Sequence, residues 1–201
     1  EMASIDVSWG NFVEKGDESS FSIIYNTHAD DLYSYGINLG FQEEMCKDAI
    51  QDTFYKLYVS KDNLIHIKNI TGYIFKSFKH RLIDLSRKNI RKETLESVAD
   101  SFTVQVTVLD NIIDSEKAEI LRKKVASLLN ELTPNQREVV YLKYMIGLEH
   151  KEIADLLDIR EESARKLLYR TMEKLRQTIS EKDFPDALSM LLTLVPFQRF
   201  F

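Results

Sequence analysis

One short stretch near the carboxyl end, residues 161–170, is crowded with side chains that can bind nucleic acid. Its charged and hydroxyl-bearing members include Glu162, Ser163, Arg165, Lys166, Tyr169 and Arg170. Arg and Lys bind phosphates, Arg also pairs with guanine, and Glu accepts a hydrogen bond from the cytosine amino group. These residue types therefore predict contacts to both the backbone and the base edges of duplex DNA.

Two short helices would have to position these side chains. Apolar residues recur at helical spacing in two stripes, Ile153, Ala154, Leu157 and Ile159, then Ala164, Leu167 and Leu168. The small side chains of Ala154 and Ala164 would let the helices cross closely, with the turn at 157–159 between them. This is helix-turn-helix spacing. An ordinary helical hairpin with a solvated charged face fits the same residues, and spacing alone leaves both interpretations open.

A second basic surface is predicted on a helix from about Ile70 to Arg91. Its cations greatly outnumber its one acid, Asp84, and they are Lys76, Lys79, Arg81, Arg87, Lys88 and Arg91. Phe75 and His80 fall among them, and single-strand binding proteins combine cations for the backbone with rings for unstacked bases. The alternative places the aromatic rings in the core and the cations in water.

The helix predicted at 42–58 has a different outer face, with Asp48, Gln51, Asp52 and Lys56. Its acids would suit a basic partner, and a simple solvated face explains them equally well. A polar loop, residues 60–69, separates this helix from the basic one and contains Leu64, Ile65 and Ile67.

Composition indicates an all-α protein. Only 6 Gly and 3 Pro occur in 201 residues that are 44% hydrophobic, which favours long helices over hairpins. Further helices are expected at 6–15, at 21–39 with Gly36 and Gly40 near its end, at 115–132, and from Thr133-Pro134 to Gly147. Residues 93–114 are acidic and lose the helical pattern, so they are expected to form a linker.

Charge and motif content narrow the function classes. The net charge of -5 means that DNA contacts must come from locally basic faces. The four His, at 28, 66, 80 and 150, have no metal-ligand spacing, and no phosphate-binding loop occurs, so we expect no enzyme, catalytic residue, metal or cofactor.

The single Cys46 is expected in the core. No apolar run of about eighteen residues and no leader pattern occurs, which predicts a soluble, cytoplasmic protein without a membrane span.

Taken together, the two halves resemble a bacterial RNA polymerase sigma factor of the extracytoplasmic-function group, group four of the sigma-70 family. LTPNQREVVYLKYMIGLEHKEIADLLDIREESARKLLYRTMEKLR is similar to the family's fourth conserved region. DAIQDTFYKLY and ITGYIFKSFKHRLIDLSRK are similar to its second region. The resemblance covers roughly residues 20–92 and 115–178.

The resemblance implies two small helical domains and a division of the chain. Residues 1–92 would form the region 2 domain, 93–114 a flexible linker, 115–180 the region 4 domain with the helix-turn-helix, and 181–201 an apolar tail. The implied function is to bind core RNA polymerase, direct initiation at specific promoters and help melt the minus-ten element. The alternative is a helix-turn-helix regulator that acts without polymerase.

The resemblance also assigns roles to residues. The polymerase-binding set, facing the clamp helices of the largest subunit, would be Asp48, Gln51, Asp52 and Tyr55. The loop 62–68 would take a flipped minus-ten base, and the region 2 DNA contacts would be Asn63, Leu64, His66, Lys68, Lys76, Lys79, His80, Arg81, Arg87 and Lys88. Glu162 and Arg165 would read the minus-thirty-five element, with Ser163 beside them and Lys151, Lys166, Tyr169 and Arg170 on phosphates. The flap of the second-largest subunit would be a further partner.

Three features depart from the family pattern. Arg160 stands where a Ser or Thr often caps the recognition helix. Glu161 and Glu162 place negative charge at the end of the helix that should approach DNA, so this domain alone is expected to bind DNA weakly. The tail crowds apolar residues such as Leu191, Leu192 and Phe197, and it is broken by Pro185 and Pro196. It is expected to dock on its own domain or on a partner, either an anti-sigma factor or a separate DNA-targeting protein.

Overall fold

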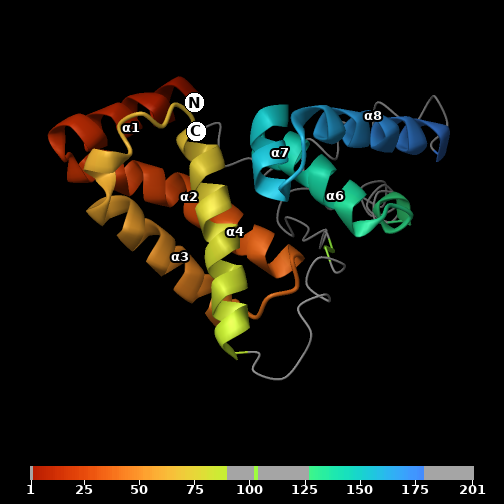
Figure 1. Ribbon diagram of the computed structural model, residues 1–201, viewed down its shortest axis with the longest axis horizontal. Coiled ribbons are helices and arrows are strands. Elements are labelled where there is room, and N and C mark those ends of the chain that lie inside the picture. The colour runs from red at the N-terminus through yellow and green to blue at the C-terminus, as the bar shows by residue number, and fades with distance from the viewer. Residues whose placement is uncertain (1, 90–101, 104–126, 179–201) are drawn as a thin grey trace, which may run out of the picture. The chain divides into compact units, whose positions relative to one another are not determined.

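The computed structural model describes residues 2–89, 102–103 and 127–178, drawn in colour in Figure 1. The chain divides into two compact units, Glu1–Val98 and Ala99–Phe201. Every regular element among the described residues is a helix, which confirms the all-α prediction.

Unit 1 is built around its second helix. Its elements are α1 (Met2–Lys15), α2 (Glu18–Asn38), α3 (Glu43–Val59), the short 3-10 helix η1 (Lys61–Asn63) and α4 (Ile70–Asn89). α2 packs against α1, α3 and α4, and Figure 1 shows α4 crossing it. The predicted helices at 21–39, 42–58 and 70–91 are therefore confirmed to within three residues at their ends.

The core of unit 1 forms where the apolar stripes of these helices meet. Ile24, Leu32 and Tyr35 of α2 are fully buried, as are Phe78 and Leu82 of α4. Aromatic rings attach α1 to this core, because Phe12 packs on Phe21 at 4.8 Å and on Tyr58 at 5.7 Å between ring centroids. Burial of such side chains is the main stabilising contribution that the helices receive.

Polar side chains fix the start and the middle of α2. The Asp17 carboxylate accepts from the backbone N–H of Ser20 at 3.0 Å and caps the helix. Hydrogen bonds from Ser20 and then Ser19 lower the pKa of this carboxyl. Deeper in the unit, His28 donates from Nδ1 to the Ile24 carbonyl at 2.7 Å and accepts the Thr71 hydroxyl of α4 at 2.9 Å.

Gly36 lies near the end of α2, but its role there is to allow close packing. It is buried inside α2, and a Cβ there would lie 2.6 Å from Sγ of Cys46 and 3.1 Å from Cζ of Phe78. Glycine is therefore required by the close approach of α3 and α4 to α2. The chain turns after the helix at Gly40, whose φ is 86°. Cys46 is buried, as expected.

Unit 2 contains α6 (Pro134–Val140), the π-helix η3 (Tyr141–Ile146), α7 (His150–Leu157) and α8 (Glu161–Thr178). Thr133 caps α6 as predicted: its hydroxyl accepts from Gln136 N at 3.3 Å and its N–H donates to Gln136 Oε1 at 3.1 Å. The predicted helix does reach Gly147, whose φ is 83°, but its second half has π geometry that the apolar pattern did not indicate.

Several sequence predictions fall outside the described residues. They are most of the predicted helix at 115–132, the linker at 93–114 apart from Phe102 and Thr103, and the tail at 181–201. Phe102 is buried, and its ring lies 5.6 Å from that of Tyr141, so this part of the predicted linker packs on unit 2.

Candidate nucleic-acid interface

The helix-turn-helix geometry is present in unit 2. α7 and α8 pack against each other, and Ala154 and Ala164 are only 3% and 0% exposed, as expected for two helices that cross closely. The turn between them is residues 158–160, one position later than predicted, and Asp158 adopts a left-handed φ of 53°. Asp tolerates this conformation better than most residues, which makes the tight turn accessible.

The outer face of α8 carries all the DNA contacts that were predicted on this helix. All the predicted contact residues on this helix are exposed, namely Glu162, Ser163, Arg165, Lys166, Tyr169 and Arg170. Tyr169 is 69% exposed, although it is a large aromatic residue. Ala164, Leu168 and Leu175 are buried on the opposite face, so the helix presents one accessible polar surface.

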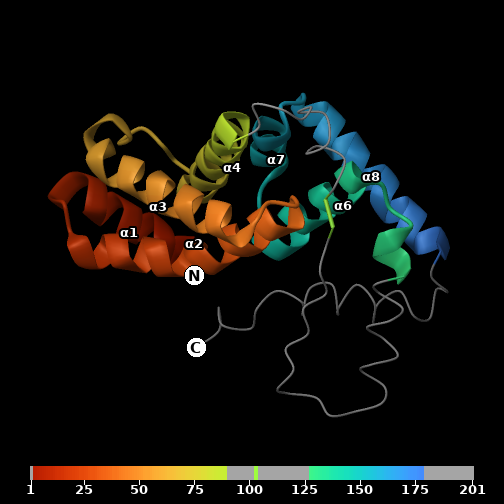
Figure 2. The same cartoon turned by 90° about the horizontal axis from the view of Figure 1, so that it is seen from below.

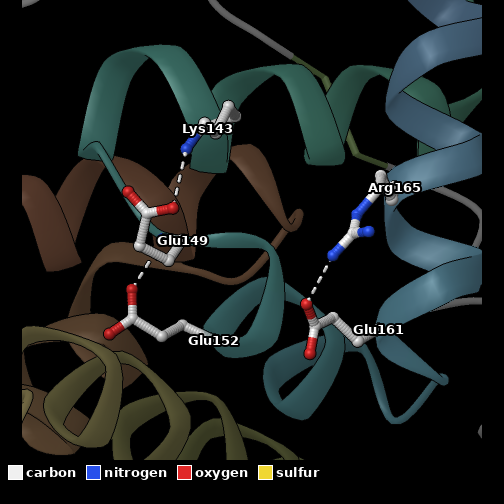
Figure 3. Close-up of polar contacts among 5 residues, drawn as sticks. All are labelled: Lys143, Glu149, Glu152, Glu161 and Arg165. Atoms are coloured by element: carbon white, nitrogen blue, oxygen red, sulfur yellow. Dashed lines mark hydrogen bonds and ion pairs between the residues drawn. The ribbon is translucent and has the colours of Figure 1, made fainter.

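Two of these cations are paired within the helix. Arg165 Nη2 lies 2.8 Å from Glu161 Oε1, as Figure 3 shows, and Lys166 Nζ lies 2.6 Å from Glu162 Oε1. Both pairs have i,i+4 spacing and are exposed, so each stabilises the helix by only a few tenths of a kcal/mol, roughly 0.3–0.5. DNA phosphates or base edges can therefore replace the carboxylates at small cost.

The start of α7 is acidic. Glu152 Oε2 accepts from the backbone N–H of Glu149 at 2.6 Å, and Lys143 Nζ lies 3.4 Å from Glu149 Oε2 (Figure 3). Burial raises the pKa of Glu152, and the neighbouring Glu149 charge raises it further. Lys151 is exposed between these acids. The negative charge near Lys151 weakens its attraction for phosphate.

The basic face of α4 is present, but one predicted member does not belong to it. His80 and Arg87 are exposed, Lys76, Lys79 and Arg81 are half-buried, and the Lys88 side chain lies outside the described residues. Phe75 is fully buried, with its ring 5.6 Å from that of Tyr35. Of the two interpretations that the sequence left open, the structure supports the one that places the Phe75 ring in the core, where it faces α2.

The loop between α3 and α4 exposes most of its candidates. Asn63, His66 and Lys68 are exposed, whereas the Leu64 side chain is buried at 8% exposure. Leu64 therefore supports the loop from inside and does not face a DNA base in this conformation. Ile65, which is 65% exposed, is the apolar side chain that the loop presents, and sequence analysis did not assign it a contact.

The candidate polymerase-binding residues lie on the outer face of α3, beside a groove of about 850 Å³. Asp48, Gln51 and Tyr55 are exposed, with Tyr55 at 68%, and Gln51, Asp52 and Tyr55 line the groove. The rest of the lining comes from α2 and α3 and includes Tyr25, Tyr33 and Tyr58. Tyr25 is 41% exposed. Tyr25 and Tyr33 lie eight residues apart on α2, a helical spacing that was the available signal in the sequence.

One ion pair connects this groove to the basic helix. The Asp52 Oδ2 atom accepts from Arg81 Nε at 2.6 Å and lies 2.5 Å from Arg81 Nη2. Asp52 was predicted to face polymerase and Arg81 to face DNA, so the structure brings together residues from two predicted surfaces. The pair engages one oxygen of Asp52 and two nitrogens of Arg81, so it partly neutralises both groups before either meets its predicted partner.

Neither a metal site nor a membrane-spanning helix is found among the described residues. No cluster of three or more His, Cys, Asp or Glu side chains that could hold a metal occurs in that part of the chain. No helix there is long and apolar enough to cross a bilayer.

Comparison with known proteins agrees with this arrangement. Residues 122–175 match the family described as sigma-70, region 4. The sigma factor SigM of Bacillus subtilis, of the extracytoplasmic-function group, is 24% identical over 76% of this chain and 91% of its own length. SigW of the same organism is 21% identical over 84% of this chain and 94% of its own.

A solved structure gives the fold. CnrH, determined in complex with the cytosolic domain of CnrY, superposes with a TM-score of 0.54 at 20% identity, over 87% of this chain and 96% of its own. Its likeness supports the helical architecture, and the sequence relatives confirm the resemblance noted above. The chain is therefore similar, over most of its length, to RNA polymerase sigma factors of the extracytoplasmic-function group, and its residues 122–175 carry the match to sigma-70 region 4.

Proposed function

We propose that unit 1 docks on core RNA polymerase and melts the minus-ten element, while unit 2 reads the minus-thirty-five element. The observation that carries this proposal is the outer face of α8, where all six candidate contact residues are exposed above a buried apolar face. A helix that only stabilised its own unit would not need this concentration of phosphate-binding and base-reading side chains.

In unit 2, Glu162 and Arg165 contact base edges in the major groove, with Ser163 beside them. Lys151, Lys166, Tyr169 and Arg170 bind the flanking phosphates. The exposed positions of all these side chains support the assignment. Because Glu161 and Glu162 lie in the first turn of α8, binding by unit 2 alone is weak, and the flap of the second-largest polymerase subunit holds the unit in place.

In unit 1, the clamp helices of the largest polymerase subunit dock on α3 over Asp48, Gln51, Asp52 and Tyr55. The groove beside these residues supports the assignment, because its exposed tyrosines offer apolar area together with hydroxyl groups. Tyr25 and Tyr58 extend this surface beyond the residues predicted from sequence.

Melting uses the loop between α3 and α4 together with the basic face of α4. The loop takes a flipped base beside Asn63, His66 and Lys68, with Leu64 as its buried support. Lys76, Lys79, His80, Arg81, Arg87 and Lys88 bind the backbone of the opened strand. The exposed Ile65 can pack against a flipped base, which compensates for part of the stacking that the base loses.

The corresponding division of the chain is a docking and melting domain at 1–92, a linker at 93–114, a promoter-reading domain at 115–180 and a partner-binding tail at 181–201. CnrH was solved bound to the cytosolic domain of another protein, which supports a similar partner for this chain. Either an anti-sigma factor or a separate DNA-targeting protein fits the apolar tail.

The test is in vitro initiation with core polymerase on a library of genomic fragments, with start sites mapped in the presence and absence of the protein. We expect the chain to co-elute with core polymerase at low salt and to create new start sites. Arg165→Ala should lose promoter-specific initiation and keep polymerase affinity. Tight duplex binding without co-elution would indicate a helix-turn-helix regulator instead, and an unchanged Arg165→Ala variant would indicate a protein-binding scaffold.

The same assay tests the tail. A chain that ends at residue 180 should still bind core polymerase but lose activity at its native promoter if a partner docks on the tail. Unchanged activity at that promoter would remove the partner from the proposal.

A further inference from the structure

The loop proposed to take the flipped base is tied to α1, an element far from it in sequence. The indole Nε1 of Trp9 donates a hydrogen bond of 3.1 Å to the backbone carbonyl of Ile67, across 58 residues. Trp9 is only 5% exposed, so the bond is shielded from competing water. The loop therefore owes part of its conformation to a side chain outside it.

Within the loop, the bond to Trp9 holds one end of a short exposed segment. Ile67 N donates to the Leu64 carbonyl at 2.9 Å, and Leu64 N donates to the Lys61 carbonyl at 2.9 Å. Leu64 is buried and fixes the other end. Ile65 and His66 lie between these two fixed residues and are exposed, so the positions of Leu64 and Ile67 determine where they point.

The helix that carries Trp9 is itself firmly placed. The Trp9 ring lies 6.1 Å from Phe12, whose ring packs on Phe21 of α2 and Tyr58 of α3. α1 also contacts η1 at the other end of the loop, and a Cβ on Gly16, directly after α1, would lie 3.3 Å from Lys61 Nζ. The core thus positions α1, and α1 positions the loop at both ends.

We propose that Trp9 is a positioning residue that sets the base preference at the minus-ten element. It touches no DNA in this role; it fixes the Ile67 carbonyl and through it the direction of Ile65 and His66. Sites that discriminate between ligands depend on such supporting contacts, because small displacements of the contacting groups remove discrimination. The inference rests on the proposed function, in which this loop takes the flipped base.

The experiment uses Trp9→Phe in the full chain with core polymerase, because phenylalanine keeps an aromatic ring in the core while it removes the donor and part of the buried ring volume. Initiation is measured on promoters that differ at single minus-ten or minus-thirty-five positions. We expect the preference for the best base at one minus-ten position to fall about three- to tenfold, the range that the loss of one hydrogen bond produces. Preferences at the minus-thirty-five element and polymerase affinity should stay unchanged.

Val13→Ala is the matched control. Val13 is 6% exposed on the same helix, and its side chain cannot hydrogen-bond to the loop. This variant should destabilise unit 1 without changing the minus-ten preference. Each variant is assayed at a temperature where its circular dichroism shows that it is folded. An equal loss of preference in Val13→Ala would show that Trp9 acts only through stability and would overturn the inference.

His66→Ala separates this inference from the proposed function. If His66→Ala changes the minus-ten preference and Trp9→Phe does not, the positioning role is wrong and the function of the loop stands. If His66→Ala also leaves the preference unchanged, the loop does not read the base, and both proposals fail together.

Discussion

At the scale of single residues, the acids of α8, the helix proposed to read the promoter, pair with its own cations. Glu161 pairs with Arg165 at 2.8 Å, and both side chains are exposed. A carboxylate in the first turn stabilises the helix dipole, but it would also repel the phosphates that this end of α8 approaches in the proposed function. In that proposal the helix gains local stability at some cost in DNA affinity.

Glu161→Gln should raise the affinity of the full chain for a minus-thirty-five duplex. The change frees Arg165 and removes one charge that repels phosphate. Exposed charges of this kind contribute about 0.5–1 kcal/mol to the binding free energy, which corresponds to a two- to fivefold increase in affinity. Fluorescence anisotropy with a labelled duplex at low salt measures it. Glu173→Gln makes the same charge change at an exposed position farther along α8 and should have less effect. Equal gains in the two variants would show that only net charge matters.

At the scale of elements, α2 is the helix on which unit 1 depends. It contacts α1, α3 and α4, and the closest approach is at Gly36, where Cys46 and Phe78 fill the space that a side chain would need. Interiors packed to this density accept added methyl groups only by shifting neighbours.

Gly36→Ala should lower the free energy of unfolding of unit 1 by about 1–3 kcal/mol, because a Cβ would lie 2.6 Å from Cys46 Sγ. Gly10→Ala is the control: nothing lies within 4 Å of its Cβ position in α1, so it should stabilise the unit by roughly 0.5–1 kcal/mol through helix propensity. Denaturation followed by the fluorescence of Trp9, the only tryptophan in the sequence, measures both. Similar effects of the two substitutions would contradict the packing argument.

The sequence predicted the elements better than their contacts. Helical periodicity located α2, α3, α4, α7 and α8 because each buries a continuous apolar stripe. It did not indicate the close packing at Gly36 and left the position of Phe75 open, because a periodic pattern does not reveal which neighbouring helix comes close. It also missed the π-helix at Tyr141–Ile146, whose single extra residue per turn leaves little trace in the apolar spacing.

For the candidate sites too, the sequence predicted which residues face outward but not which residues they contact. The outward set on α8 could be predicted, since helical spacing places it opposite Ala164 and Leu168. The pairing of Arg165 with Glu161 depends on side-chain rotamers, and the bond from Trp9 to Ile67 joins segments 58 residues apart. Such long-range contacts are set by tertiary packing, which no local pattern contains.

At the scale of the molecule, the proposed docking and melting surfaces share one ion pair. Asp52 faces the groove on α3, and Arg81 belongs to the basic face of α4. While Asp52 accepts from Arg81, two donors of that guanidinium are engaged and its charge is partly neutralised, which weakens its attraction for DNA. If polymerase engages Asp52, Arg81 is released at the moment when a strand must be bound. This order would keep a chain of net charge -5 from binding DNA before it joins polymerase.

Asp52→Asn should therefore weaken polymerase binding and strengthen binding of the free chain to a single-stranded minus-ten oligonucleotide by about two- to fivefold, the value of an exposed ion pair. Asp48→Asn is the matched control, because it removes the same charge from the exposed face of α3 one turn earlier, and Asp48 is not the partner of Arg81. Fluorescence anisotropy without polymerase measures the affinity for the oligonucleotide, and co-elution measures binding to core polymerase. If both variants bind the oligonucleotide equally well, Asp52 does not withhold Arg81, and docking and strand capture are independent. If only Asp52→Asn gains affinity, the pair couples the two steps through a single carboxylate oxygen.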